Sequence, residues 1–166
     1  FAEISSKQAT LMLKWYSKVN KEKAELLYLA AFLQETGKIL ISSDVIQEDE
    51  AISFKSEIEL STNIAQVEKM YVDVTSSEVT AEVFSHWGFD DDFVEMIKYA
   101  DNPTAAPQEI QEYAMALNIV KTILPINQPF SEQAINFGLR QARDAGYDYE
   151  LLEDAIDDML AIEEES

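Results

Sequence analysis

The sequence contains no cysteine and only one histidine among its 166 residues. Without cysteine, disulfide bonds and thiolate chemistry are excluded, and the composition fits a reducing compartment such as the cytoplasm. The longest uninterrupted apolar run, Leu26–Leu33, has eight residues, whereas a helix that spans a membrane needs about 20. We therefore expect a cytoplasmic protein without a membrane segment.

Glycine and proline are also scarce, with four of each. Because these residues punctuate turns and hairpins, their scarcity indicates long helices with few tight turns. At 166 residues the chain can bury the core of one domain, and no linker, internal repeat or low-complexity segment divides it. The expected fold class is all-α.

Basic residues are few: 12 lysines and arginines stand against 32 aspartates and glutamates, which gives a net charge of -20. A surface of this sign repels phosphate backbones and anionic lipid head groups, so binding to nucleic acid or to a membrane is disfavoured. A basic face on a protein partner is the natural complement of such a surface.

The stretch Ala24–Ile41 is the segment around which the fold is expected to form. Every residue from Leu26 to Leu33 is apolar, so a helix here has no polar stripe for water, and we predict that it is buried on all sides. The apolar pattern stops at Gln34 and resumes at Ile39. Polar residues inside a core helix do not fit the apolar pattern of their neighbours, and such departures are expected at functional sites.

Local signals predict the other helices. Thr75 to Glu78 form a capping box, which predicts a helix from Ser76 to about Trp87 that ends at Gly88. Trp87 and Trp15 are expected to be core or half-buried anchors. Further helices are predicted after a cap at Ser5 or Ser6, over residues 49–60 and 63–72, after Asp90 to Asp92, from Pro107 to Leu124, after Ser131 and from Asp148.

Two segments carry a resemblance to a known family. Ala30–Lys38 resembles the helix of the HD-domain superfamily in which adjacent histidine and aspartate bind a metal for phosphohydrolysis, and Gln34 and Glu35 stand at those two places. Thr75–Phe89 is similar to a segment of the HDOD branch of that superfamily, whose members are mostly degenerate HD domains. Ser76 stands at the histidine place of that segment.

Two later segments extend the resemblance. Met96–Pro103 looks like an HDOD segment in which histidines occur at the places of Tyr99, Ala100 and Asp101. Ala114–Thr122 resembles the helix that carries the last aspartate of the metal site, and Asn118 falls at about that place. The four segments follow the order of the family.

The resemblance implies a fold and a role. The fold is a multi-helix HD/HDOD-like bundle around a buried central helix, with residues 1–166 as a single domain that lacks the family's N-terminal helices. The role is in bacterial signal transduction, where such domains act as regulatory or scaffolding modules.

The metal site of the superfamily needs several imidazole ligands together with carboxylates. The one histidine, His86, stands next to Trp87 near a predicted helix end and is typical of a surface or capping residue. The carboxylates that remain, Glu35 and Asp101, could hold at most a weakly bound hard cation. We therefore expect no metal and no other cofactor.

The candidate degenerate pocket comprises the residues at the resembling places and around the break in the central helix: Gln34, Glu35, Gly37, Lys38, Ser76, Tyr99, Asp101 and Asn118. Lys38 follows Gly37 without the glycine-rich run of a phosphate loop, so a solvated lysine is favoured. Ser76 has no neighbouring base in the sequence, and the capping box explains it better than a nucleophilic role does.

We expect a non-catalytic domain that binds a protein partner or a small ligand through this metal-free pocket. Two alternatives remain open. One is a residual metal-dependent phosphohydrolase acting on nucleotides or cyclic dinucleotides. The other is a ligand-sensing module that binds a nucleotide without a metal.

Overall fold

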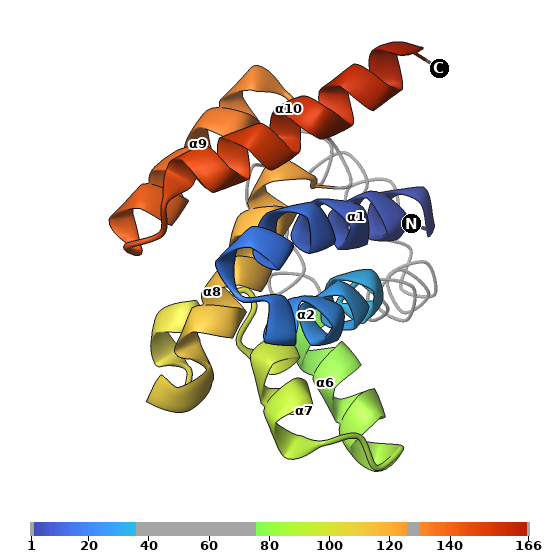
Figure 1. The fold of residues 1–166 in the computed structure, drawn as a ribbon. Coiled ribbons are helices and arrows are strands. Elements are labelled where there is room, and N and C mark those ends of the chain that lie inside the picture. The colour runs from blue at the N-terminus through green and yellow to red at the C-terminus, as the bar shows by residue number, and fades with distance from the viewer. Residues whose placement is uncertain (1, 36–75, 126–129, 166) are drawn as a thin grey trace, which may run out of the picture.

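The computed structural model describes residues 2–35, 76–125 and 130–165, and these residues form helices without any strand (Figure 1). The helices are α1 (Ala2–Val19), α2 (Lys21–Leu33), α6 (Ser76–His86), α7 (Asp91–Lys98), the short 3-10 helix η1 (Pro103–Ala105), α8 (Gln108–Ile123), α9 (Glu132–Asp144) and α10 (Tyr149–Glu165). The predicted all-α fold class is confirmed. The helices predicted over 49–60 and 63–72 lie outside the described residues.

The helices pack as three groups (Figure 1). α1 and α2 lie side by side, joined at Asn20, and both contact α8. α6 and α7 form a helical hairpin on one side of this centre, where α7 contacts α2 and α8. α9 and α10 lie on the opposite side, where α9 packs on α8 and α10 packs on α1.

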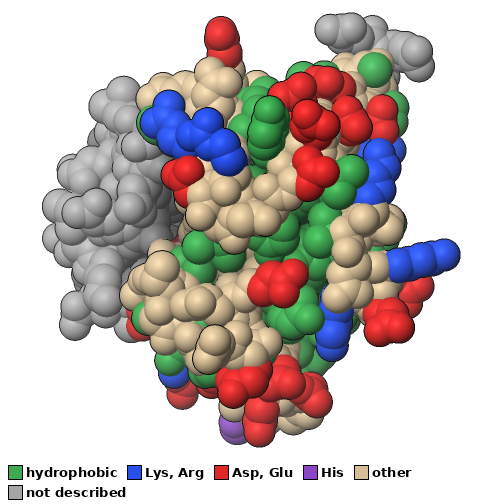
Figure 2. All heavy atoms as spheres, turned by 60° about the vertical axis from the view of Figure 1, so that its left-hand side comes forward, with side chains coloured by type: hydrophobic (Ala, Val, Ile, Leu, Met, Phe, Trp, Pro, Cys, Tyr) green, Lys and Arg blue, Asp and Glu red, His purple; other side chains and the backbone are tan. Residues whose placement is uncertain are grey.

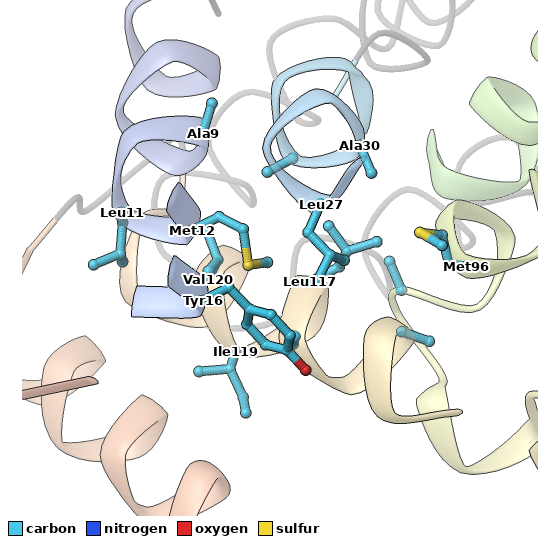
Figure 3. Packing of buried hydrophobic residues seen from close by; sticks show 14 of the residues in the cluster. Ala9, Leu11, Met12, Tyr16, Leu27, Ala30, Met96, Leu117, Ile119 and Val120 are labelled. Carbon is cyan, nitrogen blue, oxygen red and sulfur yellow. The ribbon is translucent and has the colours of Figure 1, made fainter. Parts of the chain in front are cut away.

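The core lies where α1, α2 and α8 meet (Figure 3). Met12 from α1, Leu27 from α2 and Leu117 from α8 are completely buried, and their side chains converge in this view. Burying each of these side chains contributes roughly 1.5–3 kcal/mol to stability. Trp15 and Tyr16 of α1 are also completely buried.

The prediction that the central helix is buried on all sides is wrong for α2. Its buried side chains form one face, made of Ala24, Leu27, Ala30 and Ala31. Tyr28, Leu29 and Phe32 on the other face are 39%, 42% and 42% exposed. α1, α7 and α8 pack against α2, and a helix buries only the face that has a packing partner. An entirely apolar run shows that a helix can be buried, but not where its neighbours lie.

Several helix boundaries follow the predicted local signals. The Asp90 side chain accepts a hydrogen bond from the Asp92 amide at 2.9 Å at the start of α7, and Ser131 Oγ accepts one from the Ala134 amide at 3.1 Å at the start of α9. Gly88 and Gly146 follow α6 and α9 with φ angles of 84° and 91°, a conformation that glycine adopts without steric cost.

Two predictions about individual residues are wrong. α1 begins at Ala2, so Ser5 and Ser6 lie inside the helix and not at its cap. Trp87 is 66% exposed, whereas Trp15 is fully buried as expected. Trp87 lies beyond the end of α6, where its ring packs edge-on against the Phe84 ring with 5.7 Å between the ring centroids. His86 is exposed at the C-terminal end of α6, as predicted.

No helix among the described residues combines the length and the hydrophobicity that a membrane crossing requires.

The contact between α8 and α9 predicts the effect of a single methyl group. Gly138 in α9 is buried, and a Cβ atom there would overlap Ile123 Cγ1 and lie 2.7 Å from Ile123 Cδ1. We expect Gly138→Ala to destabilise the protein by about 1–3 kcal/mol, although alanine favours the helical state by roughly 1 kcal/mol. Urea unfolding measures the difference. Gln133→Ala, at an exposed position of the same helix, is the control, and equal stability of the two variants would contradict the close contact.

Candidate functional site

The break in the central helix becomes a buried polar corner in the structure. Gln34 and Glu35 directly follow α2, and their side chains are 0% and 3% exposed. The Gln34 amide still donates to the Ala30 carbonyl at 2.9 Å, so the helical hydrogen bonding continues for one more residue. Because polar groups without water must find partners within the protein, the two side chains depend on residues from other helices.

Gln8 of α1 is the first of these partners. Its Oε1 accepts a hydrogen bond from Gln34 Nε2 at 2.9 Å. Its Nε2 donates to Glu35 Oε1 at 3.2 Å and to the Leu124 carbonyl at 2.9 Å. Gln8 is completely buried, so its amide group joins α1, the end of α2 and the end of α8 through bonds that water does not weaken.

Lys121 of α8 supplies a positive charge to the same corner. Its Nζ lies 2.8 Å from Asp101 Oδ1 and 3.8 Å from Glu35 Oε1, and it donates a hydrogen bond to Ser77 Oγ at 3.1 Å. The Lys121, Glu35 and Asp101 side chains are 11%, 3% and 15% exposed. We call Lys121, Glu35, Asp101 and Ser77 the Lys121 network. In this network one ammonium group faces two carboxylates, and all three side chains are largely shielded from solvent.

Asn118, one turn before Lys121, holds the segment that carries Asp101. Its Nδ2 donates to the Ala100 carbonyl at 2.7 Å, and its Oδ1 accepts from Gln141 Nε2 of α9 at 2.8 Å. The backbone next to Asp101 is thereby fixed to α8. Asn118 is therefore a positioning residue for the Lys121 network.

The structure brings together part of the predicted pocket. Gln34, Glu35 and Asp101 lie in or beside the Lys121 network, and Asn118 lies one turn away on α8. Tyr99 is partly buried, and Lys98 Nζ lies over its ring, 5.4 Å from the ring centroid. The remaining predicted residues are not described: Ser76 begins α6 but its side chain is not placed, and Gly37 and Lys38 lie outside the described residues.

The donor set does not fit the metal that the HD resemblance implies. Gln34, Ser77 and Asn118 offer amide or hydroxyl oxygens, which are weak ligands for transition metals compared with imidazole or carboxylate. Within the described ranges, no three side chains of the histidine, cysteine, aspartate or glutamate type lie close enough to share an ion. The Lys121 ammonium also repels any second cation placed between Glu35 and Asp101.

Sequence reasoning missed Gln8, Ser77 and Lys121. A signal existed for two of them. Lys121 lies four residues after Leu117 and three before Leu124, and Gln8 lies four residues before Met12. Both positions therefore belong to the inward stripe of their helices. A polar residue on such a stripe is expected to be buried, so it needs a hydrogen-bond partner or an opposite charge inside the protein.

The chain is similar to one protein family and to several solved structures. The model of the HDOD domain matches residues 1–103. A virulence factor from Campylobacter jejuni subsp. jejuni has a similar fold, with a TM-score of 0.73 and 22% identity, over 90% of this chain and 58% of that chain. A protein from Shewanella amazonensis SB2B, described as a "putative phosphohydrolase", has a TM-score of 0.67 and 17% identity, over 94% of this chain and 58% of its own.

The family match and the structural matches cover different parts of the chain. The family match covers Gln8, Glu35, Ser77 and Asp101 but ends before Lys121. The two solved structures cover more of the chain, so the shared fold extends beyond residue 103, while this chain spans less than two thirds of either of them. At these identities the structural likeness shows the fold alone. The comparison with curated proteins found no match.

The Lys121 network predicts a large loss of stability when its cation is removed. Lys121→Met leaves two nearly buried carboxylates without the ammonium, and we expect a loss of about 3–5 kcal/mol in the free energy of unfolding, measured by urea titration. Lys21→Met, at an exposed position, should change stability by no more than about 0.5 kcal/mol.

A combined variant separates charge from packing. Adding Glu35→Gln and Asp101→Asn to Lys121→Met should recover part of the loss, because neutral amides need no counter-charge. Equal losses in the single and the combined variant would show that the ammonium does not compensate these carboxylates.

Proposed function

This chain belongs to the HDOD domain family, and on that premise we propose that it is a non-catalytic regulatory or scaffolding domain of bacterial signal transduction. The observation that supports this proposal is the position of the Lys121 ammonium between Glu35 and Asp101. In this chain the positive charge of the corner belongs to a side chain.

A tethered ammonium cannot replace a metal in phosphohydrolysis. A catalytic metal keeps an open coordination position, where it binds water and lowers the pKa of that water. An ammonium group has no vacant position for a ligand and can only donate its protons. Lys121 Nζ already pairs with Asp101 at 2.8 Å and donates to Ser77 Oγ at 3.1 Å, with Glu35 Oε1 3.8 Å away.

The polar corner serves the fold better than it serves a ligand. The Gln8 side chain bonds to Gln34, to Glu35 and to the Leu124 carbonyl, so a small molecule that bound these groups would have to displace Gln8 or Lys121. Each displacement breaks a buried hydrogen bond or ion pair, which costs more than an exposed contact returns. This favours binding on the outer surface over binding in the degenerate pocket.

The outer surface favours a protein partner with a basic face. A net charge of -20 attracts oppositely charged proteins over distances of about the Debye length and accelerates their encounter. The absence of cysteine is consistent with action in the cytoplasm. We therefore propose that the corner keeps the helices in place while the acidic exterior recognises the partner.

Metal and turnover assays test the proposal. We expect elemental analysis after incubation with manganese, iron or magnesium salts and desalting to find less than stoichiometric metal, because the Lys121 ammonium lies between the two carboxylates and repels a second cation. Nucleotides and cyclic dinucleotides should show no hydrolysis above the buffer control. Stoichiometric metal together with turnover that Glu35→Ala abolishes would establish the alternative, a metal-dependent phosphohydrolase.

A further inference from the structure

A groove of about 660 Å³ lies away from the polar corner, between the end of α1, the start of α8 and the turn that joins α9 to α10. Its apolar lining includes Val19, Met115 and Leu151, and its polar lining includes Gln108, Gln111 and Glu112. Figure 2, which brings the left-hand side of Figure 1 forward, shows apolar side chains across the middle of this face with acidic side chains beside them. The volume lies within the range of about 300–1,000 Å³ that is typical of ligand sites.

Glu112 is held in place at this groove by two tyrosines. The Tyr16 hydroxyl donates to Glu112 Oε1 at 3.1 Å, the Tyr147 hydroxyl donates to the Glu112 carbonyl at 2.8 Å, and the two hydroxyl oxygens lie 3.0 Å apart. The Trp15 ring packs edge-on against both tyrosine rings, with centroids 5.2 Å and 5.1 Å away. Burial raises the pKa of both phenols above its usual value, so the hydroxyls stay protonated. Tyr16 and Tyr147 are therefore positioning residues for Glu112.

The Glu112 carboxylate is exposed to solvent and has no cationic partner in the part of the chain that the structure describes. Two other charged residues line the groove, Asp148 and Lys18, so its lining carries a net negative charge. A carboxylate that is already held in place loses little conformational entropy when it pairs with a cation. More of the interaction energy then contributes to affinity, so Glu112 is a good candidate for an energetically important contact.

We propose that this groove binds a basic segment of a protein partner, with an arginine or lysine side chain on Glu112 and an adjacent apolar side chain on Met115 and Leu151. Gln108 and Gln111 line the groove and can pair with the main chain of such a segment, because amide side chains both donate and accept hydrogen bonds. Gln111 would do so mainly through its Oε1, since its Nε2 donates to the Thr104 carbonyl at 3.1 Å. The net charge of -20 favours a basic protein over a neutral one. This inference rests on the proposed binding function and assigns a surface to it.

Peptide titration followed by NMR tests the groove. The probes are N-acetyl-Leu-Arg-Leu-amide and its counterpart with glutamate in place of arginine, added to the 166-residue chain. We expect saturable shifts of the backbone amides of Lys18, Gln111, Glu112 and Leu151 with the arginine peptide, and none with the glutamate peptide. The affinity should fall as salt increases, because the contact is between exposed charges.

Two variants of equal charge locate the contact. Glu112→Gln keeps an oxygen that accepts from Tyr16, so the fold should persist while the affinity falls about tenfold or more. Glu109→Gln removes the same charge from an exposed residue of α8 that does not line the groove, and its affinity should change by less than about threefold. Equal weakening by both variants, shifts spread over α10, or no saturable shift at millimolar peptide would overturn the proposal.

Two further measurements distinguish a different occupant of the groove from a failure of the proposed function. Sedimentation of the chain without peptide tests self-association, and a dimer that Glu112→Gln dissociates would assign the groove to a second copy and overturn the basic partner. Metal-dependent turnover would refute the proposed function whatever the peptides do. An unperturbed groove in a protein without turnover would refute this surface alone.

Discussion

The pairing of the Lys121 ammonium with Glu35 and Asp101 is the interaction on which the centre of this structure depends. Moving an unpaired charge into a protein interior costs several kcal/mol, so the two carboxylates and the ammonium stabilise one another there. The pairing therefore fixes the end of α2, the segment after α7 and the middle of α8 relative to one another. Gln8 adds α1 to the same assembly through its bonds to Glu35 and Leu124.

Two carboxylates converge at this corner, and the one positive charge that the structure places beside both of them belongs to the Lys121 side chain. Carboxylates that converge in a buried place need a cation, and either an ion or a side chain can supply it. A side-chain cation is always present and needs no uptake from solution, but it leaves no ligand position for water. The ammonium therefore joins the segments that carry the two carboxylates.

The polar corner and the proposed docking groove are built on the same two helices. α1 carries Gln8 at the corner and Tyr16 at the groove, eight residues or about 12 Å further along the helix. α8 carries Lys121 at the corner and Glu112 at the groove. Because α1 and α8 pack against each other, the interactions at the corner hold the frame on which Tyr16 and Glu112 meet. A rigid frame of this kind reduces the entropy that binding must overcome.

Local features of the sequence determined the helical class and several of its boundaries. The cap at Ser131, the acidic start after Asp90 and the stops at Gly88 and Gly146 act through atoms within a few residues, so the sequence around each of them contains the whole interaction. The family-like segments likewise predicted a pocket that includes Gln34, Glu35, Asp101 and Asn118, and these four residues lie in or beside the polar corner.

Only the tertiary structure decided which residues complete the site and which faces remain exposed. Gln8 bonds to the carbonyl of a residue 116 positions away, and Lys121 meets carboxylates from two other segments. The exposure of Tyr28, Leu29 and Phe32 likewise depends on which helices lie beside α2. Composition and periodicity state which side chains need a partner, whereas the packing of distant helices decides which partner comes within bonding distance.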